Sequence, residues 1–356
     1  MTTSAFDHPW LGGLFADDAM ADIWSSDTQL AHMTAFEAAW SRALGEHVLG
    51  DKNVGEAAAK AIEAMSFDVD DIRAGLGKDG VPIPRMVAQM KAAAGTTVSD
   101  AGAVHKGATS QDVVDTALVL TLRETSFLIA GRLMELETSL KTLEAKFGDR
   151  PMMGRTRMQA ATPITVRDRI EAWRRPVATH LERLDQLRPR VEVVQIGGAS
   201  GDRKALGAHA DAVVADVAKA LGLAPNDKAW HAMRDSVAEY ASFLSLVSGT
   251  LGKIGQDMCL MAQQGIDELR MSGGGGSSAM PHKQNPVLAE LLVTLARFNA
   301  TQISGMHQSL VHEQERSGAA WSLEWMLLPQ MAQATGRGLA AAIDLCTRIE
   351  RIGAAD

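Results

Sequence analysis

A stripe of large apolar residues, recurring every three or four positions, runs through residues 110–147 and constrains the fold more than any other feature. It consists of Leu118, Leu122, Ile129, Leu133, Leu136, Leu140, Leu143 and Phe147. This spacing places the side chains on one face of an α-helix. A helix from Ser110 to Phe147 would be about 57 Å long at about 1.5 Å per residue. Such a helix needs partners of similar length to bury its stripe, which predicts a helix bundle.

Other stretches repeat the helical pattern, and the composition agrees with it. Helices are predicted over residues 27–47, 165–186, 230–264, 286–312 and 321–352. Alanine, leucine and methionine are abundant, aromatic residues make up 4%, and no run of alternating β-branched residues predicts a sheet. The predicted fold class is therefore all-α, a long-helix bundle.

The first hundred residues differ from the rest of the chain. A helix that opens on Asp27 as its cap is followed by shorter helical pieces, which glycines and prolines between positions 75 and 84 interrupt. We therefore expect a small helical domain at residues 1–100 and a central long-helix bundle domain at residues 101–356.

Several patterns predict a cytoplasmic protein. The N-terminus lacks the charged and apolar parts of a secretory signal, and Cys259 and Cys346 lie in apolar helical pattern, which is typical of reduced packing residues. A net charge of −8 argues against a general nucleic-acid binder. The uncharged segment Tyr240–Gly252 is shorter than the ~18 residues of a membrane span. Because it is apolar or small on every face, we expect it to be buried between subunits.

The segment MSGGGGSSAMPHKQNP, residues 271–286, carries the strongest chemical signal. Asn285 and Pro286 resemble an N-cap and a first helical residue. Residues 277–283 would then lie at the positive end of a helix, beside Lys283, where an anion is favoured. The glycines would allow the loop to act as a mobile lid. The alternatives are a solvated linker and a phosphate-binding loop, although no strand precedes the segment.

Four further segments contain residues suited to anions. In AVHKGATSQDVVDTA, residues 103–117, Thr109 or Ser110 caps the long helix, and His105 and Lys106 precede it. GRTRMQAATP, residues 154–163, places Arg155 and Arg157 in a predicted loop before a helix. In WHAMRDSVAEY, residues 230–240, a tryptophan and a histidine are predicted to open a helix, whereas HEQERSGAAWSLEW spans residues 312–325. Capped helices, solvated arginines and charged connections are the plainer interpretations, and no spacing suggests a metal site.

Taken together, these segments resemble the fumarase/aspartase superfamily. GSSAMPHKQNP fits its signature at every defined position, and VHKGATSQDVVDT and GRTRMQAATP resemble its other active-site segments. The resemblance implies a homotetramer whose long helices form a shared core, active sites assembled from three subunits, and no cofactor or metal. FDHPWLGGLFAD, VVQIGGASGDRKALG and HEQERSGAAWSLEWMLLP are most similar to the superfamily's 3-carboxy-cis,cis-muconate cycloisomerases, lactonising enzymes of aromatic degradation.

The resemblance also implies roles for individual residues. Ser277 would exchange the proton next to a substrate carboxylate, and Lys283, Asn285 and His105 would complete the catalytic set. Substrate-binding roles are implied for Thr109, Ser110, Arg155, Arg157, Gln159, Trp230, His231, Ser278, Met280 and Arg316. Many superfamily lyases have a histidine where this chain has Arg157. We therefore hypothesise that Arg157 pairs with the substituent at carbon 3 of a muconate, which could be a sulfonate.

Other activities remain open at this point. A superfamily lyase that releases fumarate, similar to adenylosuccinate lyase, would use Ser277 in the same way, and a non-catalytic helical scaffold could keep the fold. Most relatives continue into a small third helical domain beyond the position that matches Asp356. From the sequence we expect that domain to be missing here.

Overall fold

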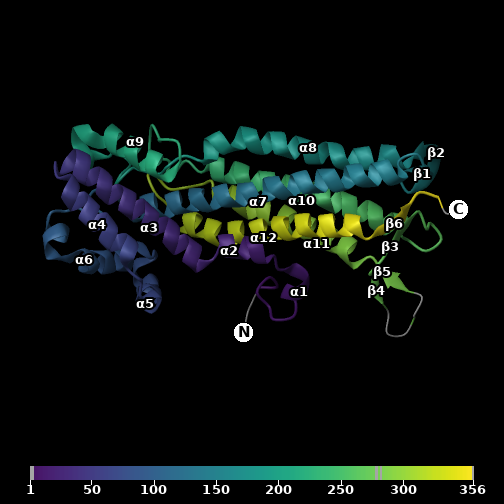
Figure 1. Ribbon diagram of the computed structural model, residues 1–356, viewed down its shortest axis with the longest axis horizontal. Coiled ribbons are helices and arrows are strands. Elements are labelled where there is room, and N and C mark those ends of the chain that lie inside the picture. Colours follow the sequence, from purple (N-terminus) through teal and green to yellow (C-terminus); the bar gives the residue numbers. More distant parts are fainter. Residues whose placement is uncertain (1–3, 277–279, 281–282, 355–356) are drawn as a thin grey trace.

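The computed structural model describes residues 4–276, 280 and 283–354. Five long helices lie side by side along the longest axis and form a bundle (Figure 1). They are α7 (Ser110–Phe147), α8 (Val166–Val191), α10 (Asp235–Met261), α11 (Val287–Gln308) and α12 (Ala319–Thr347). The predicted bundle is confirmed, and the predicted range of its longest helix is the observed one.

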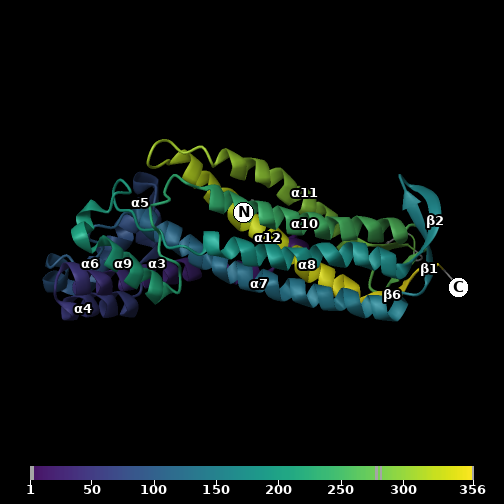
Figure 2. The ribbon, with the colours of Figure 1, turned by 90° about the horizontal axis from the view of Figure 1, so that it is seen from above.

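Shorter helices gather at the end of the bundle where α7 begins (Figures 1 and 2). The short helices of the chain are α1 (Gly12–Phe15), α2 (Asp18–Ile23), α3 (Ser26–Ala43), η1 (Leu44–Val48), α4 (Lys52–Ala64), α5 (Val69–Asp79), α6 (Ile83–Asp100), η2 (Lys204–His209) and α9 (Ala210–Leu221). Of these, α1 and α2 lie beside the bundle rather than at its end (Figure 1).

Three antiparallel pairs of short strands, which the sequence did not predict, lie at the opposite end (Figure 1). They are β1 (Pro151–Thr156) with β2 (Gln159–Thr165), β3 (Leu269–Met271) with β6 (Ile349–Ile352), and β4 (Gly275–Gly276) with β5 (Gln284–Asn285). The GRTRMQAATP segment is therefore a β-hairpin and not a loop. It has no alternating β-branched pattern because most of its β2 side chains are exposed.

Several predicted helix starts differ from the observed ones. Ser25, whose side chain accepts a hydrogen bond from the Thr28 N–H at 3.2 Å, caps α3 in place of Asp27. Helix α11 is capped by Pro286, because Asn285 pairs with Gly275 in the β4–β5 ribbon. Helix α10 begins at Asp235, so the tryptophan and histidine at positions 230 and 231 precede it.

The buried apolar residues form two separate clusters. The larger one runs along the bundle, and the smaller one joins α3, α4 and α6 to α9 and to the first turns of α7. The smaller cluster thus also includes residues that follow position 101 in the chain. The division into domains 1–100 and 101–356 stays a prediction.

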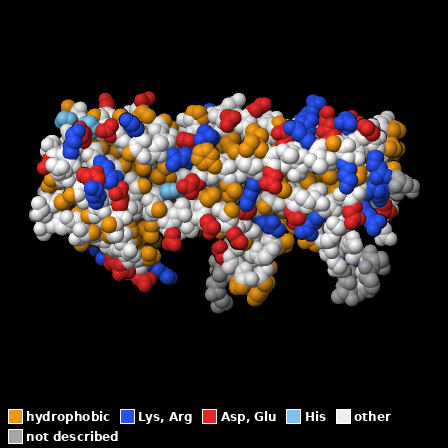
Figure 3. Space-filling model, viewed as in Figure 1, with side chains coloured by type: hydrophobic (Ala, Val, Ile, Leu, Met, Phe, Trp, Pro, Cys, Tyr) orange, Lys and Arg blue, Asp and Glu red, His pale blue; other side chains and the backbone are white. Residues whose placement is uncertain are grey.

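Some large apolar side chains remain exposed along the bundle, and Figure 3 shows hydrophobic side chains reaching its surface. Phe127 is 55% exposed, Met134 54% and Leu246 52%. Leu246 belongs to the Tyr240–Gly252 segment, whose other residues are mostly buried within this chain. Its burial between subunits stays a prediction. Cys259 and Cys346 form no disulfide, and no described helix has a stretch apolar enough to cross a membrane.

Candidate active site

The first turn of α7 is organised around Asp112, a fully buried residue that the sequence analysis did not single out. Its Oδ2 accepts hydrogen bonds from the backbone N–H of Thr109 at 3.0 Å and of Gly198 at 2.9 Å. Its Oδ1 accepts from the N–H of Gly197 at 2.9 Å and lies 2.8 Å from Nε2 of His231. Asp112 therefore ties the predicted residues Thr109 and His231 together.

Gly197 explains one of the glycines in the VVQIGGASG segment. A Cβ atom added there would lie 2.4 Å from Cβ of Ala229 and 2.7 Å from Cε1 of His231. Only glycine leaves room for the histidine to reach Asp112 while its own N–H donates to the same carboxylate. The neighbouring Trp230 is held by its backbone N–H, which donates to Gln195 at 3.0 Å, and by its indole N–H, which donates to the Val194 carbonyl at 3.1 Å.

His105 lies in the turn before α7 and forms an ion pair with the small helical cluster. Its Nδ1 is 2.5 Å from Oε1 of Glu37, a fully buried residue of α3. Burial would lower the pKa of His105, but the charge and the hydrogen bond of the Glu37 carboxylate outweigh it, and the pKa is raised. His105 is thus favoured in its charged form beside the start of α7.

Arg316, in the connection between α11 and α12, also lies beside the first turn of α7. Its Nε donates to Oε1 of Gln111 at 3.0 Å, and one Nη donates to the carbonyls of Gly198 at 3.4 Å and Ala199 at 3.2 Å. Its other Nη has no hydrogen-bond partner among the described residues. The structure therefore brings His105, Thr109, Ser110, Trp230, His231 and Arg316 to one end of the bundle.

Arg234, Asp115 and Glu324 form a buried ion cluster that the sequence did not predict. The Arg234 side chain is fully buried and donates to both carboxylate oxygens of Asp115, at 2.7 and 3.1 Å, and of Glu324, at 2.9 and 2.5 Å. The Trp321 indole N–H donates to Asp115 at 3.0 Å. Arg234 was visible in WHAMRDSVAEY, but no local pattern indicates that two carboxylates from distant helices converge on it.

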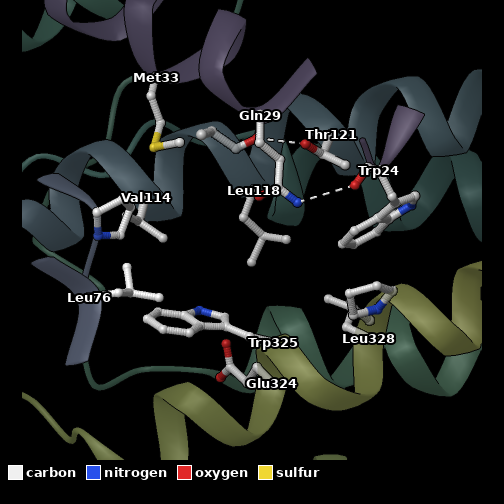
Figure 4. Close-up of a pocket in the computed structure, with 13 residues that line it drawn as sticks. Trp24, Gln29, Met33, Leu76, Val114, Leu118, Thr121, Glu324, Trp325 and Leu328 are labelled. Atoms are coloured by element: carbon white, nitrogen blue, oxygen red, sulfur yellow. Dashed lines mark hydrogen bonds between the residues drawn. The ribbon is translucent and has the colours of Figure 1, made fainter. Parts of the chain in front are cut away.

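An apolar pocket of about 300 Å³ has Glu324 among its lining residues (Figure 4). Trp24 and Trp325 line it together with aliphatic side chains of α7 and α12, and Gln29, Thr121 and Glu324 are its polar members. Burial raises the pKa of Glu324, against the opposing effect of Arg234. These walls do not suit a substrate with several carboxylates, so the group around Arg316 is the better candidate for an anion site.

The second set of predicted residues lies in the β1–β2 hairpin. Arg155 pairs with Glu268 at 3.1 Å, whereas Arg157 and Gln159 are exposed. Arg157 and the next residue, Met158, have φ angles of 49° and 68°, which the tight turn between the strands requires. Lys and Arg side chains gather on the surface toward this end of the bundle (Figure 3).

The described residues of the signature segment, 271–276, 280 and 283–286, lie at the same end, before α11 (Figure 1). Lys283 is exposed, its backbone N–H donates to the Met280 carbonyl at 3.0 Å, and Asn285 is half-buried in β5. Ser277 and Ser278 are outside the described residues, so the predicted lid and its catalytic serine stay predictions.

The two sets lie at opposite ends of the same bundle. Between them runs α7, whose 38 residues span about 57 Å at about 1.5 Å per residue. One chain therefore does not bring Arg157 and Lys283 to the start of its own α7.

Comparison with known proteins identifies the family of this architecture. The family described as Lyase matches residues 12–305. A 3-carboxy-cis,cis-muconate cycloisomerase of Pseudomonas aeruginosa is 36% identical over 93% of this chain and 73% of its own length. An N-acetyl-S-(2-succino)cysteine lyase of Enterococcus italicus is 32% identical over 93% of this chain and 73% of its own.

Solved structures agree with these relatives. The 3-carboxy-cis,cis-muconate lactonizing enzyme of Pseudomonas putida has a TM-score of 0.90 and 34% identity, with coverage of 97% of this chain and 77% of its own. A fumarate lyase of Mesorhizobium sp. BNC1 has a TM-score of 0.87 and 30% identity, with coverage of 95% and 76%. With its long-helix bundle and a family match over residues 12–305, the chain belongs to the Lyase family, the fumarase/aspartase superfamily that it resembles in sequence.

Proposed function

We propose that the protein is a 3-carboxy-cis,cis-muconate cycloisomerase, an isomerase that closes a lactone within one tricarboxylate molecule. The observation that carries the proposal is the 36% identity to an enzyme of that name over 93% of this chain. The start of α7 supports it with Arg316, whose guanidinium offers positive charge to a polyanion. Free cysteines agree with a reducing compartment such as the cytoplasm.

The reaction needs a proton donor and a site for negative charge. One carboxylate oxygen of the substrate adds to a conjugated double bond, forming the C–O bond of the lactone and leaving an enolate on the neighbouring carboxylate. Ser277 gives its hydroxyl proton to the carbon of that enolate, and its alkoxide then takes a proton from water. Lys283, Asn285 and the N–H groups of a helix N-terminus stabilise the enolate before the proton arrives.

We further infer that the working unit is a homotetramer with shared sites. Arg157 and Lys283 lie at one end of the bundle and Arg316 at the other, so a neighbour that runs antiparallel to this chain would bring these two groups together. The exposed Phe127, Met134 and Leu246 give the bundle an apolar surface that such a neighbour would cover. A sedimentation measurement that returns a stable monomer would overturn this assembly.

A substrate assay tests the activity. Purified protein is mixed with 3-carboxy-cis,cis-muconate, and the loss of ultraviolet absorbance by the conjugated diene is followed. We expect absorbance to fall as a lactone isomer of the same mass forms. A flat absorbance trace with a well-folded tetramer would remove the cycloisomerase proposal.

A lyase that releases fumarate is the second candidate, and the 32% identity to an N-acetyl-S-(2-succino)cysteine lyase favours it. There the same serine would remove a proton, and the leaving group would depart as fumarate forms. N-Acetyl-S-(2-succino)cysteine and adenylosuccinate, offered in parallel, should yield no fumarate if the first proposal is right. Fumarate release without loss of the muconate would reverse the choice.

A further inference from the structure

Gln111, in the first turn of α7, lies between the buried ion cluster and the candidate anion site. Its Nε2 donates to Oδ2 of Asp115 and to the backbone carbonyl of His231, each at 3.0 Å. Its Oε1 accepts from Nε of Arg316, also at 3.0 Å. Gln111 is fully buried, so these partners replace water entirely.

The charges around Gln111 allow only one orientation of its amide. Two acceptors face Nε2 and a guanidinium faces Oε1. A flipped amide would set its oxygen against the Asp115 carboxylate and the His231 carbonyl, and its NH₂ group against Arg316. All three hydrogen bonds would then be lost inside the protein, where unpaired polar groups are costly.

Asp115 is itself fixed by the cluster beneath it. Both its oxygens accept hydrogen bonds from Arg234, and the indole of Trp321 donates to one of them. The second carboxylate on Arg234, from Glu324, anchors the guanidinium to α12. A continuous path of hydrogen bonds thus runs from Arg234 through Asp115 and Gln111 to Arg316.

We propose that Gln111 is a positioning residue that orients Arg316 toward a substrate carboxylate, with Asp115 and Arg234 setting the direction of its amide. The contact at Nε and the two backbone carbonyls on one Nη hold the guanidinium plane, which leaves the other Nη to meet the anion. The inference rests on the proposed polycarboxylate substrate and adds a residue that orients the group that binds it.

The test is the kinetics of Gln111→Met, which keeps the length of the side chain and removes its polar atoms. We expect KM to rise about tenfold or more, with kcat within about twofold, because an Arg316 contact made equally with substrate and transition state affects binding alone. Gln111→Glu keeps an acceptor for Arg316 but sets its second oxygen against the Asp115 carboxylate and the His231 carbonyl, so its KM should rise as well. A fall in kcat with an unchanged KM would overturn the proposal.

A matched control separates positioning from loss of stability. Asn299→Leu removes another buried amide, which bonds Ser248 and Thr335 in the core of the bundle away from Arg316. It should lower thermal stability comparably and leave KM within about twofold. An equal rise of KM in this variant would mean that Gln111 acts through folding alone.

A double-mutant cycle gives the sharpest test. In an Arg316→Ala background, Gln111→Met should add little to KM, because the residue through which it acts is gone. Fully additive effects would contradict the proposal. Calorimetric titration with propane-1,2,3-tricarboxylate repeats the comparison without turnover. If the wild-type protein binds this anion but does not convert 3-carboxymuconate, the proposed function fails while the role of Gln111 is still decided.

Discussion

The end of the bundle where α7 begins and the end that carries the β1–β2 hairpin hold the predicted site residues in different surroundings. At the first end, Asp112, Gln111 and His231 are buried and joined by hydrogen bonds within the chain. At the second, Arg157 and Lys283 are exposed. The first group is built by the folding of one chain. In the proposed tetramer, a neighbouring chain would bring the second group to its ligand.

The largest expected effect tests whether the two ends act in different chains. Ser277→Ala should lower kcat about 10²- to 10⁴-fold, as the loss of a general acid or base does. Arg316→Ala, at the other end, should also lower kcat/KM severely. Tetramers co-assembled from equal amounts of the two variants should regain roughly a quarter of wild-type activity, because some sites receive both intact groups from different subunits.

The measurement compares kcat/KM of the mixture with that of each parent. Co-expression of two differently tagged chains, followed by tandem purification, yields the mixed tetramers. Activity that stays at the parental level would mean that Ser277 and Arg316 of one site come from one chain, and the proposed sharing would be wrong.

A second experiment compares the stability of the two ends. Arg234→Met strands two buried carboxylates and should lower the free energy of unfolding by about 3–5 kcal/mol. Arg155→Met removes the partly exposed pair with Glu268 and should cost at most about 1 kcal/mol. Urea denaturation at one protein concentration, followed by circular dichroism, measures both. Equal losses of unfolding free energy would show that the ion pair of the hairpin stabilises the fold as much as the buried cluster does.

A third experiment addresses specificity at the hairpin. If Arg157 pairs with the substituent at carbon 3, Arg157→Ala should shift the ratio of kcat/KM for 3-carboxymuconate and 3-sulfomuconate by about tenfold. Met158→Ala is the matched control, since Met158 is 71% exposed in the same turn. An unchanged ratio in Arg157→Ala would rule out that role.

The smallest effect is a pH dependence of stability that distinguishes the start of α7 from helix α8. The raised pKa of His105 means that its pair with Glu37 stabilises the fold fully below the ordinary value of 6.5, and this contribution is lost as pH rises through the folded pKa. In the bundle, burial lowers the pKa of His180 to about 4, so its effect is opposite, a loss of stability as pH falls from 6.5 toward 4.

Two variants separate these contributions in thermal melts across the pH range. Glu37→Gln should remove the loss of stability on the alkaline side, and His180→Gln should reduce the loss on the acid side. An alkaline slope that survives in Glu37→Gln would have to come from another group.

The sequence by itself determined the long helices, because the 3.6-residue period of apolar positions is a local property that packing only reinforces. The range of α7 followed from its apolar stripe and its first-turn polar residues, whereas the anion site that residue types predict at residues 277–283 stays a prediction. Helix starts were harder, since tertiary hydrogen bonds keep residues 230 and 231 out of α10 and pairing keeps Asn285 out of α11.

Only the tertiary structure decided which charges meet. Asp115, Arg234 and Glu324 are at least 90 positions apart in the sequence, and nothing near any of them indicates the others. The same holds for the separation of Arg157 from Arg316, which depends on the direction in which each helix runs through the bundle. Local periodicity determines the elements, whereas the contacts that orient a functional group depend on how those elements pack.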